Sequence, residues 1–163
     1  MHTLPWNVLF VCTGNSARSI MAEVIMNQLG SGRFKAYSAG FKPRGSVHPM
    51  TLDILARQRY PVDGLRSKSW QEFLQDDAPR MDFIFTVCDQ AAGELCPVWP
   101  GQPITAHWGF ADPAALTGTH EQQFRAFFDV QQQIANRVKL FISLPFDKLD
   151  RLALHNRLRD LGC

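Results

Sequence analysis

Short apolar runs alternate with longer segments of helical periodicity along this chain. The apolar runs predict four strands, at residues 8–11, 34–40, 82–87 and 104–108. Between them, apolar residues recur every three or four positions, which predicts helices over 20–29 and 48–59. Alternating strands and helices are typical of a parallel sheet that is covered on both faces. We therefore expect an α/β fold.

The second half of the chain carries further helix signals. Ser69-Trp70-Gln71-Glu72 has the form of a capping box and predicts a short helix. A long helix is predicted from about Glu121 to Leu144, because its apolar side chains form one stripe. We interpret this stripe as core; it comprises Phe124, Phe127, Phe128, Ile134, Val138, Phe141 and Ile142. The tail 145–163 alternates leucines with basic residues and predicts either a helix packed on the domain or a dimer contact.

The length and charge of the chain restrict the classes of function that it can have. A chain of 163 residues with 45% hydrophobic residues can bury a core, and we expect one domain over 1–163 with its core at about 6–144. The 17 Lys and Arg residues are scattered among 15 Asp and Glu, which argues against a nucleic-acid partner. No run approaches the ~20 apolar residues that cross a bilayer, and the first residues lack the features of a signal peptide. We expect a cytoplasmic protein that does not bind membranes.

The most distinctive segment is Cys12-Thr13-Gly14-Asn15-Ser16-Ala17-Arg18-Ser19, which links the first predicted strand to a helix. Backbone N–H groups of residues 13–18 can converge on a tetrahedral oxyanion at the helix N-terminus. Arg18 would complete this cradle with a planar, permanently charged group. The helix dipole and Arg18 favour a Cys12 thiolate, to which Ser19 can donate a hydrogen bond. Gly14 and Asn15 tolerate the left-handed dihedrals that we expect in so tight a loop.

Other reactive residues follow the later predicted strands. Cys88 ends the third strand, Cys96 lies eight positions beyond it, and Asp112 follows the fourth strand. Ligands of open α/β sheets bind beyond the carboxyl ends of the strands, so we expect these segments to meet the Cys12 loop. A buried structural cysteine is the alternative interpretation of Cys12. Zinc binding by Cys88 and Cys96 is disfavoured, because structural sites use closely spaced ligand pairs. We interpret Cys163 as a bystander.

Over about Val8 to Leu144, the chain resembles the arsenate reductases of the low-molecular-weight protein tyrosine phosphatase superfamily. The motifs that carry this resemblance are the Cys12 loop, Tyr37-Ser38-Ala39-Gly40, Leu65-Arg66-Ser67-Lys68-Ser69 and His107-Trp108-Gly109-Phe110-Ala111-Asp112-Pro113. The resemblance implies a flavodoxin-like three-layer sandwich whose four-stranded parallel sheet has the order 2-1-3-4. It also implies that Cys12 is the nucleophile, Arg18 the oxyanion clamp and Asp112 the general acid. The substrate-binding residues would be Thr13, Gly14, Asn15, Ser16, Ala17, Arg18 and Ser19.

Phosphate and arsenate can use the same loop, so the fate of the covalent adduct on Cys12 separates hydrolysis from reduction. Reduction needs a second thiol, and under this resemblance we expect Cys88 to attack Cys12 and Cys96 to resolve the resulting disulfide. Such an enzyme would serve arsenic detoxification without a bound cofactor. Its reductant would be thioredoxin, or glutathione with glutaredoxin, because the Cys88 to Cys96 interval is longer than in the thioredoxin-coupled branch. Ala17 stands where a cysteine is common in that branch.

Two other functions are compatible with the loop. A low-molecular-weight protein tyrosine phosphatase would hydrolyse phosphomonoesters, but Ala114-Ala115 stand where an aromatic pair would face a phosphotyrosine ring. A non-catalytic oxyanion-binding or redox-sensing protein is the second alternative, although Cys12, Arg18 and Asp112 are all present.

Several residues have open roles at this level. His107 either orients Asp112 or contacts substrate, or it is a packed core residue. Arg66 and Lys68 either form a solvated turn or steer anions toward the mouth. The resemblance also implies a potassium ion near the loop, beside Asn15, Glu23 and Ser38. We expect a monomer, with a dimer through residues 145–163 as the alternative.

Overall fold

A four-stranded parallel sheet lies at the centre of the molecule, which the computed structural model describes for residues 5–87 and 103–162. The sheet has the order β2-β1-β3-β4. Its strands are β1 (Trp6–Cys12), β2 (Phe34–Gly40), β3 (Phe83–Thr86) and β4 (Ile104–His107). All three neighbouring pairs are parallel, with Cys12 opposite Gly40 and Val11 opposite Thr86. The predicted fold class and strand order are therefore confirmed.

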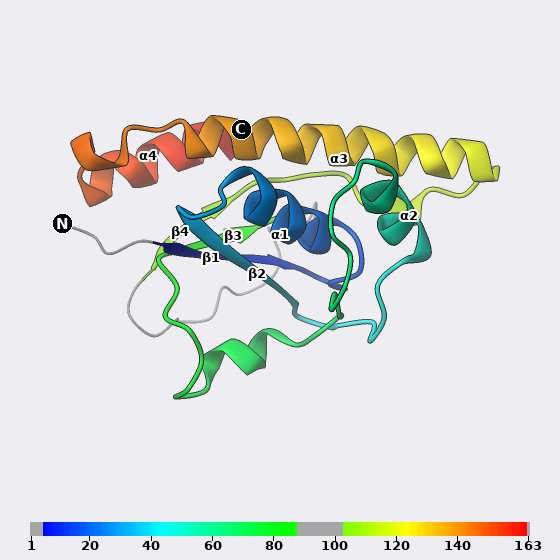
Figure 1. The fold of residues 1–163 in the computed structure, drawn as a ribbon, viewed down its shortest axis with the longest axis horizontal. Coiled ribbons are helices and arrows are strands. Elements are labelled where there is room, and N and C mark those ends of the chain that lie inside the picture. The colour runs from blue at the N-terminus through cyan, green and yellow to red at the C-terminus, as the bar shows by residue number, and fades with distance from the viewer. Residues whose placement is uncertain (1–4, 88–102, 163) are drawn as a thin grey trace.

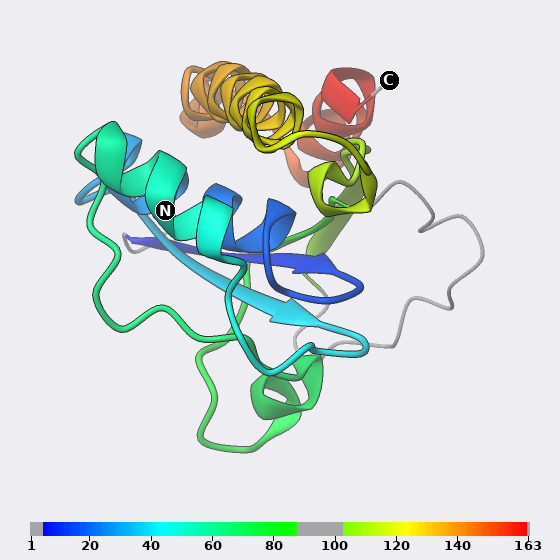
Figure 2. The same cartoon turned by 90° about the vertical axis from the view of Figure 1, so that its right-hand side faces the viewer.

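The α-helices lie on one face of this sheet (Figure 1). They are α1 (Arg18–Leu29), α2 (Pro49–Arg57), α3 (His120–Ile142) and α4 (Arg151–Gly162). Turned by 90°, the fold shows the 3-10 helix η1 (Trp70–Leu74) and its flanking loops on the opposite face (Figure 2). Two shorter 3-10 helices complete the described elements, η3 (Pro113–Ala115) and η4 (Phe146–Lys148). Both faces are covered as expected, and among the described residues η1 is the helix that covers the second face.

Alternation along the central strand β1 divides the core into two clusters. Val8, Phe10 and Cys12 belong to the large cluster under the α-helices, whereas Leu9 and Val11 belong to a small one that packs against η1. The large cluster is rich in aromatic rings; the centroids of Phe85 and Trp108 lie 3.9 Å apart. Cys12 is therefore anchored at the carboxyl end of a strand that is buried on both faces.

Two local predictions differ from the structure. Ser69 accepts a hydrogen bond from the N–H of Gln71, but Glu72 forms a bidentate pair with Arg66 instead of closing a capping box. The ion pair forms instead of the capping box because the side chains of Arg66 and Glu72 are both exposed and can reach each other. Phe128 is 40% exposed and is not core, since it follows the buried Phe127 by only one helical position.

The tail forms a helix that packs on the domain, which was one of the two predicted alternatives. Leu154 and Leu158 of α4 are buried in the large cluster. The indole N–H of Trp108 donates to the carbonyl of Leu158 at 3.1 Å, which ties α4 to the end of β4. No helix within residues 5–87 and 103–162 is long and apolar enough to cross a membrane.

Candidate active site

The loop between β1 and α1 turns its carbonyl groups outward. N–H groups of the segment 41–48, which follows β2, donate to four of these carbonyls at distances between 2.9 and 3.1 Å; the acceptors are Cys12, Thr13, Gly14 and Ser16. Ser67 and Thr51 side chains add bonds to the carbonyls of Gly14 and Ser16. Because the carbonyls are held outside, the N–H groups are left for the inside of the loop.

Those N–H groups form the cradle that the sequence predicts. The N–H of Asn15 donates to Cys12 Sγ at 3.3 Å. Within the described part of the chain, the N–H groups of Thr13, Gly14, Ser16 and Ala17 have no protein acceptor. Ala17 is the N-cap of α1 and has no capping side chain, so the first turn of the helix is open to a ligand. An oxyanion above Cys12 would meet several unpaired donors and the positive end of the helix dipole.

The hydrogen bonds around Cys12 favour donation of the Ser19 proton to the sulfur. The backbone N–H of Lys68 donates to Asn15 Oδ1 at 2.9 Å, so the other end of this amide is the nitrogen. Asn15 Nδ2 therefore donates to Ser19 Oγ, which lies 2.7 Å away. With its oxygen accepting from Asn15, the Ser19 hydroxyl is free to donate to Cys12 Sγ at 2.9 Å. This donation places a hydroxyl hydrogen against the buried sulfur of Cys12.

Two backbone features allow the loop to close this tightly. Asn15 has φ of 47°, in the left-handed region, as predicted. Gly14 does not have a positive φ, so that part of the prediction is wrong. Gly40 is the residue that needs to lack a side chain, because a Cβ there would lie 2.7 Å from the carbonyl oxygen of Thr13. The glycine lets the end of β2 pass directly against the loop.

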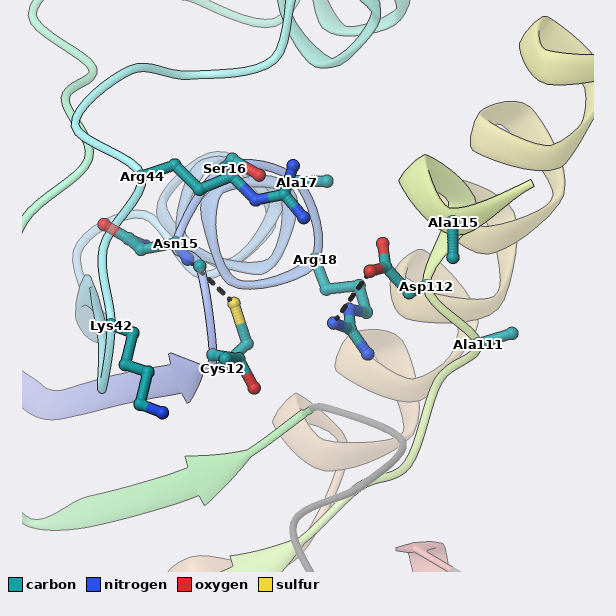
Figure 3. Close-up of a pocket in the computed structure, with 12 residues that line it drawn as sticks. Cys12, Asn15, Ser16, Ala17, Arg18, Lys42, Arg44, Ala111, Asp112 and Ala115 are labelled. Carbon is teal, nitrogen blue, oxygen red and sulfur yellow. Dashed lines mark hydrogen bonds and ion pairs between the residues drawn. The ribbon is translucent and has the colours of Figure 1, made fainter. Parts of the chain in front are cut away.

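Arg18 and Asp112 face each other across the mouth of the loop (Figure 3). Arg18 is buried, and its Nη1 donates to the carbonyl of Phe110 at 3.1 Å while its Nη2 lies 3.6 Å from Asp112 Oδ2. The other carboxylate oxygen of Asp112 accepts from the N–H of Ala114 at 3.0 Å, as the N-cap of η3. One oxygen is thus held by the backbone and the other is directed into the site.

These groups line a cavity of about 510 Å³. Figure 3 shows Asp112 with Ala111 and Ala115 on one side of it, and Lys42 and Arg44 on the other. None of the described residues that line it is aromatic. Lys42 and Arg44 are not among the residues predicted for the site, although their position just after the end of β2 is a usable signal.

Two histidines, His107 and His48, lie at different distances from the site. His107 lies on β4, exposed, with Nδ1 2.8 Å from Thr86 Oγ1, and it does not line the cavity. His107 is therefore not a packed core residue, and its hydrogen bond within the described residues is to Thr86 and not to Asp112. His48 is the histidine near the site: its Nδ1 accepts from the N–H of Met50 at the start of α2. Burial and the charge of Arg44 lower the pKa of His48, while Asp112 opposes this shift.

Arg66 and Lys68 differ in their surroundings. Arg66 is exposed and pairs with Glu72, which agrees with a solvated turn, whereas the Lys68 side chain is turned inward. Neither residue is among the described residues that line the cavity. Lys68 Nζ lies 3.3 Å from Ser38 Oγ and 3.8 Å from Glu23 Oε1. Two of the residues expected around potassium, Glu23 and Ser38, are hydrogen-bonded to each other, but the Lys68 ammonium already lies against both. With this ammonium in place, these side chains do not fit a potassium ion.

The structure brings Cys12, Arg18 and Asp112 together around one cavity, which loop residues 13–18 also line, while Ser19 contacts the Cys12 sulfur. Two other predicted site residues, Cys88 and Cys96, lie outside the described residues, as does Cys163.

Comparison with known proteins places this geometry in a family. The family described as low molecular weight phosphotyrosine protein phosphatase matches residues 7–151. An arsenate reductase of Bacillus subtilis is 34% identical over 134 residues, which cover 82% of this chain and 93% of the relative. Among solved structures, an arsenate reductase in the phosphate-binding state is 29% identical with a TM-score of 0.67, covering 85% of this chain and 97% of that one. The crystal structure of arsenate reductase from Archaeoglobus fulgidus is 28% identical with a TM-score of 0.61, covering 81% and 98%. From this match and the loop geometry, the chain belongs to the low molecular weight phosphotyrosine protein phosphatase family.

Proposed function

We propose that this protein is an arsenate reductase, in which Cys12 attacks arsenate and the adduct is resolved by further thiols. The observation that carries the proposal is the placement of a hydrogen-bonded sulfur beneath a ring of free N–H groups, with Arg18 and Asp112 at its mouth. Relatives that are arsenate reductases support the choice of arsenate among tetrahedral oxyanions.

In the first step, the N–H groups of the loop and the Arg18 guanidinium hold the arsenate oxygens. The thiolate of Cys12 attacks arsenic and forms a sulfur–arsenic bond. An arsenate oxygen departs as water, and Asp112 donates the proton that makes it a good leaving group. Arg18 stabilises the negative charge on the remaining oxygens, in a position held by its bond to the carbonyl of Phe110.

In the second step, the thiolate of Cys88 attacks Cys12 Sγ. The electron pair of the sulfur–arsenic bond stays on arsenic, which leaves as As(III) arsenite, and a Cys12–Cys88 disulfide forms. Cys96 then attacks Cys88, which releases Cys12 as a thiolate and leaves a Cys88–Cys96 disulfide. The two electrons are restored by an external thiol, either thioredoxin or glutathione with glutaredoxin. Because the cycle consumes reduced thiols, it would run in the cytoplasm.

Hydrolysis of phosphomonoesters is the competing activity, because the same cradle accepts phosphate. The shape of the cavity argues against a phosphotyrosine substrate. Its wall beyond Asp112 is formed by Ala111 and Ala115, and no aromatic ring among its described lining residues could stack on a tyrosyl ring.

The decisive assay is arsenate-dependent NADPH oxidation, run once with thioredoxin and thioredoxin reductase and once with glutathione, glutaredoxin and glutathione reductase. Serine variants of Cys88 and Cys96 are compared with Cys163→Ser as the matched control. We expect Cys88→Ser and Cys96→Ser to abolish steady-state turnover while Cys163→Ser keeps it. Mass spectrometry after a single turnover is expected to find the Cys88–Cys96 disulfide. Continued turnover of arsenate by Cys88→Ser would refute the relay.

A further inference from the structure

Lys68 places a charged ammonium group inside the protein, next to the active-site loop. Its side chain is only 9% exposed. Three oxygen acceptors surround Nζ: the carbonyl of Arg66 at 2.9 Å, Ser38 Oγ at 3.3 Å and Glu23 Oε1 at 3.8 Å. These groups come from three separate parts of the chain, namely the segment before η1, the strand β2 and the helix α1. The lysine thus joins elements that each border the Cys12 loop.

The surroundings of this ion pair are unfavourable for charge. Burial raises the pKa of Glu23 and lowers the pKa of Lys68, in both cases against the attraction between them. Removing two charges from water usually costs more free energy than their mutual attraction restores. Buried ion pairs are therefore poor sources of folding stability. We therefore consider which groups of the active-site loop the pair positions.

A continuous set of hydrogen bonds leads from Lys68 to the nucleophile. Glu23 accepts from the Ser38 hydroxyl, and Ser38 in turn accepts from the Lys68 ammonium. The backbone N–H of the same lysine holds Asn15 Oδ1, and Asn15 Nδ2 holds Ser19 Oγ. The carbonyl of Lys68 also accepts from the N–H of Gly40, which lies against the loop. Both ends of Lys68 are therefore fixed, and its backbone sets the orientation of Asn15.

We propose that Lys68 is a built-in cation that positions the active-site loop, so that this enzyme needs no alkali-metal ion. An oxygen-lined pocket with a carboxylate, a hydroxyl and a carbonyl is suited to a hard cation. Here the ammonium is covalently attached, and its own backbone N–H carries the effect to Asn15. A free ion would have to be bound from solution, whereas the lysine is always present. The proposal rests on the role of Cys12 as the nucleophile.

The test compares the wild type with Lys68→Met in potassium chloride and in tetramethylammonium chloride of equal ionic strength. The primary readout is the rate at which iodoacetamide alkylates Cys12, followed by peptide mass spectrometry. This rate needs no turnover, so it distinguishes failure of the present proposal from failure of arsenate reduction. The kcat and KM for arsenate are measured in parallel. Lys139→Met on the exposed face of α3 is the matched control.

For the wild type and for Lys139→Met, we expect the same alkylation rate in both salts. For Lys68→Met in tetramethylammonium we expect a loss of about tenfold, the scale of one charge-assisted hydrogen bond, and recovery when potassium fills the vacated pocket. Activation of the wild type by potassium would overturn the proposal, and this arm holds even if the variant fails to fold. So would a Lys68→Met rate equal to wild type in tetramethylammonium. If Lys68→Met were alkylated slowly in both salts, the loss would come from the lysine hydrogen bonds alone. That result would also overturn the proposal.

Discussion

Removal of the Ser19 hydroxyl tests the hydrogen-bond order at the centre of the site. Ser19 Oγ is completely buried and lies 2.9 Å from Cys12 Sγ. A hydrogen bond to a charged group contributes about 1.5–3 kcal/mol, and each ~1.4 kcal/mol corresponds to a factor of ten. Ser19→Ala is therefore expected to slow alkylation of Cys12 at neutral pH by roughly 10- to 150-fold, if the loss falls entirely on the thiolate.

The same substitution also has a cost in folding stability. Without Ser19 Oγ, the Nδ2 group of Asn15 loses its acceptor in a buried site, which costs about 1–3 kcal/mol. Urea unfolding measures this loss separately from the alkylation rate. Ser143→Ala is the matched control, since that hydroxyl donates to the carbonyl of Leu140 at the exposed end of α3. An alkylation rate unchanged or raised in Ser19→Ala would show that Cys12 donates to the serine, and the derived proton direction would be wrong.

Three further predictions follow from the same geometry. Asp112→Asn keeps the cap of η3 but cannot donate a proton, so kcat for arsenate should fall by about 10²- to 10⁴-fold, and an unchanged kcat would remove Asp112 from its role. Gly40→Ala places a Cβ 2.7 Å from the Thr13 carbonyl oxygen and should lower the free energy of unfolding in urea by about 1–3 kcal/mol; wild-type stability would contradict the close approach. The pKa of His48 is held below its ordinary value of 6.5, so the unfolded chain binds the extra proton. The free energy of unfolding should therefore decline as pH falls from 6.5 through the folded pKa, and less so in His48→Asn, as urea titrations at several pH values can check.

Much of this site could be predicted from the sequence because its central features are local. The apolar run before Cys12 and the helical spacing after Arg18 are enough to place a strand, a tight loop and a helix N-terminus in order. Asp112 could be placed at the same mouth, since parallel strands present their carboxyl ends at one edge. Chain order and the period of the hydrophobic pattern determined these elements.

Other features depend on contacts between distant parts of the chain. Lys68 contacts Asn15 across 53 positions, and nothing in the sequence around either residue indicates that contact. From its sequence, the turn that contains Lys68 is compatible with a solvated turn. Only the packing of β2 and α1 around it makes the ammonium a buried group. His107 was uncertain for the same reason, because the direction of a side chain at a strand end depends on its neighbours in the sheet. The sequence by itself thus determined which reactive groups are present. The tertiary structure decided which charged groups lie beside them, because burial and hydrogen-bond direction arise only when separate segments pack together.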